Sequence, residues 1–301
     1  MVLQGKAVVI TGSGRGIGAA TAARAARLGA RVVVNDVDGD VAEATAAAIR
    51  AAGGEAVAIA ADITQWDEAG RLIAGCVEAF GRIDGLVNNA GLFRMGRIDE
   101  LDPEHVTAMF AVNINGAAYC ASHAARRMIP QGSGTIVNIV SGAQMGIPTM
   151  GAYGATKGAL ATFTYAWAAE LGAKGIRVNA VSPMADTRMV DTTMAYQQSH
   201  DLPVFAREQP AAEDNAPAIC FLLSDLSSGL NGQVLRSEGR QIALIAHPVI
   251  IDPPLERDRW DEQAIAAAFD ETLGRHLSPI GIASARVEPV GGGSAFWKTR
   301  T

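Results

Sequence analysis

Short runs of β-branched and other apolar residues recur along the first 245 residues, and alanine-rich stretches separate them. Continuous apolar runs are typical of strands buried on both faces, and the helical stretches between them suit the crossovers of a parallel sheet. The pattern predicts an α/β fold with a doubly wound parallel sheet of about seven strands and helices on both faces. The expected strands are residues 7–11, 31–35, 56–61, 83–89, 134–140 and 176–182, with a weaker one around 233–235.

Two segments depart from this alternation. Residues 184–210 mix polar residues with Met184, Met189, Met194, Tyr196 and Phe205, which suits a substrate lid with an adaptable apolar underside. After residue 246 the chain turns to HPVIIDPP, a helical stretch from about 261 to 276 and a glycine-rich end. We therefore expect one α/β domain over residues 1–246 and a C-terminal extension over 247–301. Composition leaves open whether the extension covers a neighbouring subunit, shapes the substrate pocket or is partly disordered.

Composition and charge exclude several classes of protein. Hydrophobic residues make up 49% of the chain and charged residues 19%, enough apolar material for a buried sheet. With a net charge of -6, the chain has no excess of positive charge to bind nucleic acid or an anionic membrane. No segment resembles a cleavable signal, and no apolar run is long enough to span a membrane. We expect a cytoplasmic protein.

Cysteine and histidine spacing gives no metal site. Cys76, Cys120 and Cys220 lie too far apart for a metal-ligand or disulfide framework, so we expect ordinary buried thiols in a reducing compartment. The five histidines include no HxxxH pair. The sequence therefore predicts no bound metal; the histidines are His105, His123, His200, His247 and His276.

The first predicted strand runs into TGSGRGIG, residues 11–18, followed by a helical pattern. Gly12, Gly16 and Gly18 would let the backbone turn sharply and approach a pyrophosphate, which the helix N-terminus stabilises. Asp36 ends the second strand, 18 residues after Gly18, near the spacing at which a carboxylate binds adenosine ribose hydroxyls. This context predicts a dinucleotide site.

The charges near this site favour NAD over NADP. Asp36 would repel a ribose 2'-phosphate, whereas Arg15 is the nearby cation that could attract one. Asp36 could instead be a turn carboxylate within NDVDGD. Asp62, after the third strand, could accept a hydrogen bond from the adenine amino group or cap a helix.

Tyr153 and Lys157 are four residues apart in a helical segment, so their side chains share one face. A free tyrosine has a pKa near ~10, and a close ammonium favours the phenolate and lowers that pKa. Lys157 is placed to do this, and Tyr153 would then act as the acid or base. Ser141, at the end of a strand, can hydrogen-bond a substrate oxygen as charge develops on it.

Four further elements follow in order along the chain: NNAG at Asn88–Gly91, VNxxG at Val112–Gly116, Ser141, and YGATK at Tyr153–Lys157, with Ser141 twelve residues before the tyrosine. By these motifs the sequence resembles the short-chain dehydrogenase/reductase family over roughly its first 245 residues. The resemblance implies a Rossmann-type fold and an oxidoreductase that interconverts a secondary alcohol and a ketone. It assigns Asn113 to a proton relay behind Lys157, and it implies a homotetramer or homodimer packed through helices near residues 103–129 and 151–174. The expected cofactor-binding residues are Gly12, Ser13, Arg15, Gly16, Ile17, Gly18, Asp36, Asp62, Ile63, Asn89, Ala90, Gly91, Tyr153, Lys157, Pro183 and Thr187.

One local pattern bears on the substrate. SPMADTRM, residues 182–189, and the VVVND second strand are similar to (3R)-hydroxyacyl-CoA dehydrogenase units of multifunctional β-oxidation enzymes. By this resemblance Thr187 binds the nicotinamide carboxamide; it could equally be a loop hydroxyl or a helix cap. We expect an NAD-dependent dehydrogenase for a bulky secondary alcohol, such as a 3-hydroxyacyl-CoA. The alternatives are an NADPH-dependent ketoreductase of the 3-oxoacyl-carrier-protein or steroid type, and a non-catalytic dinucleotide sensor.

Overall fold

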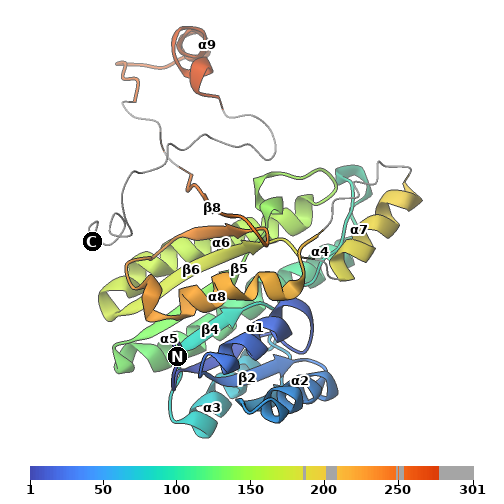
Figure 1. The fold of residues 1–301 in the computed structure, drawn as a ribbon. Helices are drawn as coiled ribbons and strands as arrows, with labels where there is room; N and C mark the ends of the chain where they lie inside the picture. Colours follow the sequence, from blue (N-terminus) through green and yellow to red (C-terminus); the bar gives the residue numbers. More distant parts are fainter. Residues whose placement is uncertain (186–187, 201–208, 249, 251–253, 278–301) are drawn as a thin grey trace.

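An eight-stranded sheet runs through the centre of the computed structural model, which describes residues 1–185, 188–200, 209–248, 250 and 254–277 (Figure 1). The first seven strands are parallel, as the apolar runs predict. In spatial order the sheet is β3-β2-β1-β4-β5-β6-β7-β8. The strands are β1 (Ala7–Ile10), β2 (Arg31–Asp36), β3 (Glu55–Ala60), β4 (Gly85–Asn88), β5 (Gly134–Ile139), β6 (Ile176–Pro183), β7 (Val234–Ser237) and β8 (Ile242–Ile245).

The sequence pattern did not reveal the edge strand β8, which returns antiparallel to β7 after a turn at Gly239. Its outward residues Ile242 and Leu244 are 62% and 66% exposed. Residues 242–246 read IALIA, a short apolar run that periodicity alone does not distinguish from a helical segment. The β8 strand ends at Ile245, next to the predicted start of the C-terminal extension.

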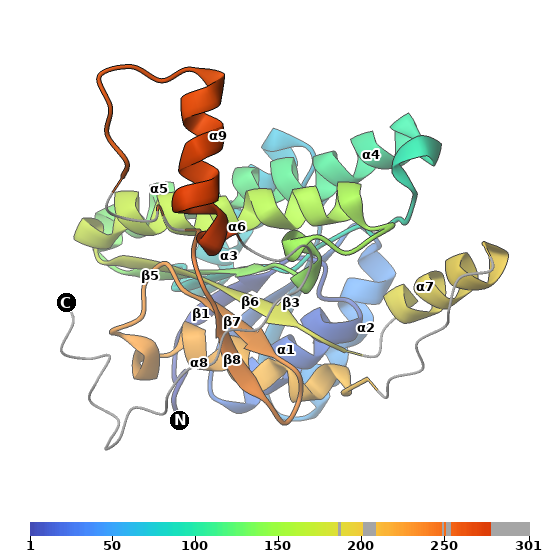
Figure 2. The same cartoon turned by 90° about the horizontal axis from the view of Figure 1, so that it is seen from above.

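Helices cover both faces of the sheet (Figure 2). One face carries α1 (Gly16–Arg27), α2 (Gly39–Ala51) and α8 (Ala216–Leu223), and the other carries α3 (Trp66–Phe80), α5 (Ala117–Gln131) and α6 (Gly151–Leu171). In β1, Val8 and Ile10 pack towards the first set of helices, while Ala7 and Val9 pack towards the second. Because alternate residues of a strand point to opposite faces, a strand buried on both sides must be apolar throughout.

Near the active site α4 (Pro103–Phe110) continues into α5 through a π-helical segment, η2 (Ala111–Gly116). Asp102 caps α4 by accepting hydrogen bonds from the backbone N–H groups of Glu104 and His105. A π-helical turn is rare and often occurs at functional sites, because it breaks the regular helical hydrogen-bond ladder. Here it contains Asn113.

The strand order places the ligand crevice between β1 and β4. The chain leaves β1 towards β2 on one side and leaves β4 towards β5 on the other. Such a reversal opens a crevice at the carboxyl ends of the two strands. The glycine-rich loop follows β1 and the Asn88–Gly91 segment follows β4, so both reach this crevice.

Two further helices lie outside the layered core. The predicted lid contains α7 (Arg188–Ser199); Phe205 and the side chain of Met189 lie outside the described residues. The helical stretch predicted near 261–276 is confirmed by α9 (Glu262–Glu271) and a 3-10 turn, η7 (Leu273–His276). None of the described helices is both long enough and apolar enough to cross a membrane.

Candidate active site

The glycine-rich loop and the segment after β4 are built around each other. The Asn89 side-chain amide donates hydrogen bonds to the carbonyls of Thr11 (2.8 Å) and Gly12 (2.9 Å). A Cβ on Gly12 would lie 2.7 Å from the Cα of Ala90, and one on Gly18 would lie 2.5 Å from the Asn89 amide nitrogen. Since neither position has room for a methyl group, glycine is required here for close packing as well as for the turn.

The N-terminus of α1 faces this crevice and is available to an anion. The helix begins at Gly16, whose φ is +55°, and Arg15 occupies the N-cap position. Within the described part of the chain, no side chain caps this helix end. Its first backbone N–H groups therefore lack side-chain acceptors, which is the property that suits a pyrophosphate.

Three predicted cofactor residues use their side chains inside the protein. The Ser13 hydroxyl is fully buried, donates to the Ile10 carbonyl (2.7 Å) and accepts from the Asn35 N–H. Ile63 is buried against Gly116. Asp62 accepts hydrogen bonds from the N–H and hydroxyl of Thr64, a local turn rather than the predicted helix cap. Only the backbone of Ser13 and Ile63 is left for a ligand.

Asp36 lies where the sequence predicts, at the end of β2. Its carboxylate accepts hydrogen bonds of 3.3 Å from the backbone N–H groups of Gly14 and Asp38, so it also organises the turn. Arg15 forms an ion pair with Asp38 (3.1 Å). The exposed side chain of Val37 lies between these groups in sequence and offers an apolar surface that sequence reasoning missed. The one cation predicted to favour NADP thus already has a carboxylate partner.

Ser141 and Tyr153 meet at the carboxyl end of β5. Tyr153 lies in the first turn of α6, is 7% exposed, and has a side-chain hydrogen bond to Ser141. Burial raises the pKa of Tyr153 to about 12, and the Ser141 hydrogen bond opposes this rise. Phe93 packs edge-on against the tyrosine ring, with centroids 4.9 Å apart. The phenol is therefore protonated at neutral pH and can donate a proton.

Lys157 lies one turn further along α6, as predicted, but it does not lower the pKa of Tyr153. Its ammonium is 5.6 Å from the Tyr153 ring centroid and donates a hydrogen bond to the Ile139 carbonyl (2.8 Å). The side chain is 3% exposed, and burial lowers the pKa of Lys157 to about 8. Desolvation is the largest cause of the shift in the Tyr153 pKa, and the only opposing cause is the hydrogen bond to Ser141.

Asn113 is brought beside this pair by the π-helical segment. It is 1% exposed, and its amide accepts from the Leu92 N–H (2.7 Å) and donates to the Leu92 carbonyl (2.9 Å) and the Thr156 hydroxyl (3.0 Å). Thr156 in turn donates to the carbonyl of Tyr153 (2.7 Å). A Cβ on Gly91 would lie 3.5 Å from the Lys157 nitrogen and 3.6 Å from the Asn113 oxygen. The amide thus ties the segment after β4 to the catalytic helix.

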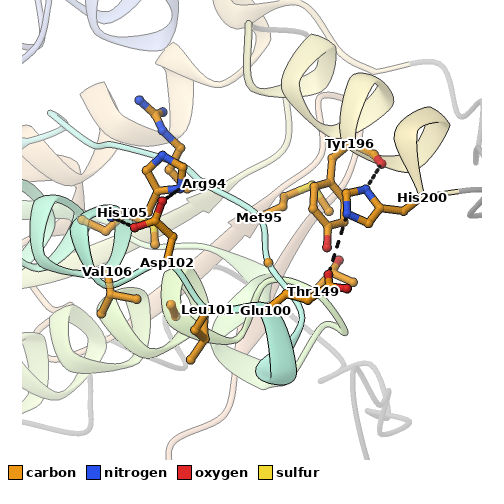
Figure 3. A pocket seen from close by; sticks show the side chains of 13 residues that line it. Arg94, Met95, Glu100, Leu101, Asp102, His105, Val106, Thr149, Tyr196 and His200 are labelled. Atoms are coloured by element: carbon orange, nitrogen blue, oxygen red, sulfur yellow. Dashed lines mark hydrogen bonds and ion pairs between the residues drawn. The ribbon is translucent and has the colours of Figure 1, made fainter.

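A cavity of about 240 Å³ lies between the segment after β4, α4, the start of α6 and α7 (Figure 3), and three of its lining residues, Met95, Met109 and Ala152, pack in the same apolar cluster as Tyr153. Gly96 and Met150 form an isolated β-bridge in its wall, and Thr149 has a φ of +66°. Tyr196 of α7 and His200, which follows the end of that helix, stack on each other, and His200 is 3.8 Å from Glu100. Sequence reasoning anticipated α7 as a cover but not the opposite wall, which contains Arg94, Met95, Leu101, Val106 and Met109.

The remaining predicted residues carry less information. Pro183 ends β6, and Thr187 lies outside the described residues. All three cysteines are buried, as predicted, and burial raises the pKa of each thiol to about 12. Across the described residues, no group of three or more His, Cys, Asp or Glu side chains could hold a metal ion.

Comparisons with known proteins agree with this geometry. The model of the family described as short chain dehydrogenase matches residues 6–202. The chain is 35% identical to the 2-(S)-hydroxypropyl-CoM dehydrogenase 3 of Xanthobacter autotrophicus, over 80% of this chain and 98% of that protein. The fold and the site are those of an oxidoreductase that acts on alcohols or ketones with a nicotinamide dinucleotide. Within it, the chain belongs to the short-chain dehydrogenase/reductase family.

Two solved structures are similar. A short chain dehydrogenase from Mycobacterium avium has a TM-score of 0.81 and 34% identity, covering 95% of this chain and 100% of that one. A xylitol dehydrogenase bound to NAD+ has a TM-score of 0.73 and 31% identity, covering 79% of this chain and 100% of that one.

Proposed function

We propose that this chain is an NAD-dependent dehydrogenase that interconverts a bulky secondary alcohol, such as a 3-hydroxyacyl thioester, and the corresponding ketone. One observation carries the proposal: Tyr153 is hydrogen-bonded to Ser141 and packs in one apolar cluster with Met95, Met109 and Ala152, which line the cavity of Figure 3. A secondary alcohol bound against the hydroxyls of Tyr153 and Ser141 would present its oxygen to both of them. Intact acid-base chemistry at this place argues against a non-catalytic dinucleotide sensor.

The crevice fits a dinucleotide on its own geometry. The uncapped N-terminus of α1 would bind the pyrophosphate, and Asp36 would accept hydrogen bonds from the adenosine ribose. The buried ammonium of Lys157, beside Gly91, would bind the nicotinamide ribose. When bound, the nicotinamide ring supplies the hydride acceptor for oxidation or the donor for reduction.

NAD is preferred over NADP because of two carboxylates. Asp36 would repel a 2'-phosphate, and Asp38 holds Arg15, the cation that could otherwise bind it. The solved xylitol dehydrogenase with NAD+ supports the same preference. These charges argue against the NADPH-dependent ketoreductase alternative.

The protein residues divide the proton chemistry between them. In reduction, Tyr153 donates its phenolic proton to the ketone oxygen, and in oxidation it accepts the alcohol proton. Ser141 hydrogen-bonds the same substrate oxygen and orients it. Lys157 and Asn113 stand behind Tyr153, where a relay of protons to solvent would begin. The high pKa of the phenol favours the protonated form, so oxidation depends on bringing Tyr153 to the phenolate.

The cavity supports a bulky substrate. Its aliphatic and thioether side chains, Met95, Leu101, Val106 and Met109, suit an apolar chain next to the reacting carbon. The SPMADTRM pattern points to the same class. We further propose that residues 1–246 form the dehydrogenase domain, that 247–301 are an extension, and that the enzyme works in the cytoplasm as a homotetramer or homodimer.

Replacing Tyr153 with Phe tests the proposal. The phenyl ring keeps the packing against Phe93 but cannot transfer a proton, so turnover of a 3-hydroxyacyl-CoA with NAD should fall about 10²–10⁴-fold. NAD affinity, measured by calorimetry, should stay within about twofold. Tyr165→Phe, on the same helix, is the matched control and should keep its activity. A Tyr153→Phe enzyme with most of its turnover would refute the proposed mechanism.

A further inference from the structure

A second cavity, of about 200 Å³, lies between α3 and α5 and shares no residue with the cavity of Figure 3. It is lined by Gly70 and Ile73 of α3 and by His123, Arg126 and Arg127 of α5. A single water molecule occupies about 30 Å³ of liquid, so the cavity has room for a small polyatomic ligand. Nothing in the dehydrogenase reaction uses these residues.

The imidazole of His123 is fixed in this cavity. Its ring packs against the Trp66 ring at a tilt of 48°, with centroids 4.2 Å apart, and makes a hydrogen bond to the Trp66 backbone. A Cβ on residue 70 would lie 2.9 Å from the imidazole Cε1, so Gly70 makes room for the ring. The Nε2 atom of His123 is buried and has no partner among the described residues. With the other ring nitrogen donating to the backbone, Nε2 of the neutral ring is a hydrogen-bond acceptor.

Two guanidinium groups complete the cavity. Arg126 lies over the face of Trp66, 5.2 Å from the ring centroid. In the described part of the chain, neither Arg126 nor Arg127 has a carboxylate within ion-pair distance. The nearby Asp67 acts electrostatically on His123, while Glu68 on the same helix pairs with Arg71. Two unpaired arginines in a cavity are conspicuous in a chain whose net charge is -6.

We infer that this cavity is a binding site for a phosphate group, either free phosphate or the end of a phosphate monoester. The two guanidiniums would bind its unprotonated oxygens, and its P–OH group would donate a hydrogen bond to Nε2 of His123. A phosphate group loses its second proton near pH ~6, so near neutral pH it can offer both kinds of oxygen. Sulfate carries the charge but has no proton to donate, so the site would distinguish the two ions.

Isothermal titration calorimetry on the full chain tests this inference. Saturating NAD is included so that the glycine-rich loop does not bind the added anion. Inorganic phosphate should bind at least about 10-fold more tightly than sulfate at the same ionic strength, and glycerol phosphate should bind like phosphate if monoesters are accepted. Arg126→Gln and Arg127→Gln should each weaken phosphate binding about 10-fold or more. Arg71→Gln removes an exposed arginine outside the cavity and should leave binding unchanged.

His123→Leu should reduce the preference for phosphate over sulfate, because it removes the hydrogen-bond acceptor while the arginines remain. Should this variant fail to fold, the two exposed arginine variants still decide the question. Equal binding of phosphate and sulfate, or the same loss in Arg71→Gln, would overturn the inference. One further result would overturn the inference. If the parent protein bound no phosphate and Arg126→Gln lowered the oligomeric mass measured by light scattering, a second copy of the chain would fill the cavity.

Discussion

The ammonium nitrogen of Lys157 lies 5.6 Å from the centre of the Tyr153 ring, one helical turn away, and both side chains are buried. Burial raises the pKa of Tyr153 to about 12 and lowers the pKa of Lys157 to about 8. Desolvation therefore favours the uncharged form of each member of the pair. A change in charge in the neighbouring crevice would therefore shift the pKa of both side chains.

The first prediction concerns the pH dependence of the reaction. Because the raised pKa leaves only a small fraction of phenolate at neutral pH, alcohol oxidation should accelerate as pH rises between about 6 and 9. Ketone reduction uses the protonated phenol and should be nearly flat over the same range. Initial rates in both directions, at saturating cofactor, measure this. An oxidation rate that falls as the pH increases would contradict the assignment of Tyr153 as the base.

Lys157→Met should separate stability from catalysis. The folded-state pKa of Lys157, about 8, lies below its ordinary value of 10.5, so the unfolded chain holds the proton more tightly. Below pH 8 the buried, protonated lysine therefore lowers the free energy of unfolding by its full amount, and this effect disappears as the pH rises towards 10.5. Below pH 8, Lys157→Met should be more stable by up to about 3 kcal/mol, and activity should collapse.

Urea unfolding of both proteins between about pH 7 and 10 measures this difference. The gap in the free energy of unfolding should narrow as the pH rises, because the wild-type lysine becomes neutral. Other titrating groups cancel in the comparison. If the gap stayed constant across this range, Lys157 would have an ordinary pKa in the folded protein.

Cofactor choice should depend on two neighbouring carboxylates. The Gly14 and Asp38 N–H groups donate to different oxygens of Asp36, so Asp36→Asn keeps one of these hydrogen bonds, loses the other and removes the charge. The KM for NAD should rise about 10- to 100-fold. Asp38→Asn should release Arg15 and improve kcat/KM with NADP about 10-fold. Initial rates with both cofactors test this. An unchanged ratio of NAD to NADP activity in both variants would disprove the proposed role of these charges.

Asn113 should prove important for both folding and activity. Asn113→Ala would leave the N–H and carbonyl of Leu92 without their buried partner, at a cost of about 2–4 kcal/mol. Thr156→Val removes one hydrogen bond to the same amide and should cost less. Thermal unfolding compares the two. Equal stability of Asn113→Ala and the wild type would show that these bonds contribute little.

The strand pattern and the motifs were sufficient for the fold and for the family. Continuous apolar runs identify buried parallel strands because every residue of such a strand meets a helix on one face or the other. TGSGRGIG, NNAG and YGATK follow such strands or lie on the helix beside them, so their order already places them at one edge of the sheet. The edge strand β8 was missed because its short apolar run, IALIA, could equally belong to a helical segment.

The tertiary structure decided what each residue does with its polar atoms. Ser13 turns inward, Arg15 pairs with Asp38, Asp62 forms a turn with Thr64, and Lys157 bonds to Ile139. These partnerships depend on which distant segments meet, and the pKa of Tyr153 depends on how completely they exclude water. Sequence alone determined the fold and the chemical groups, since both follow from local pattern. Desolvation, the cavity walls and the cavity beside His123 arise only when residues far apart in the chain pack together.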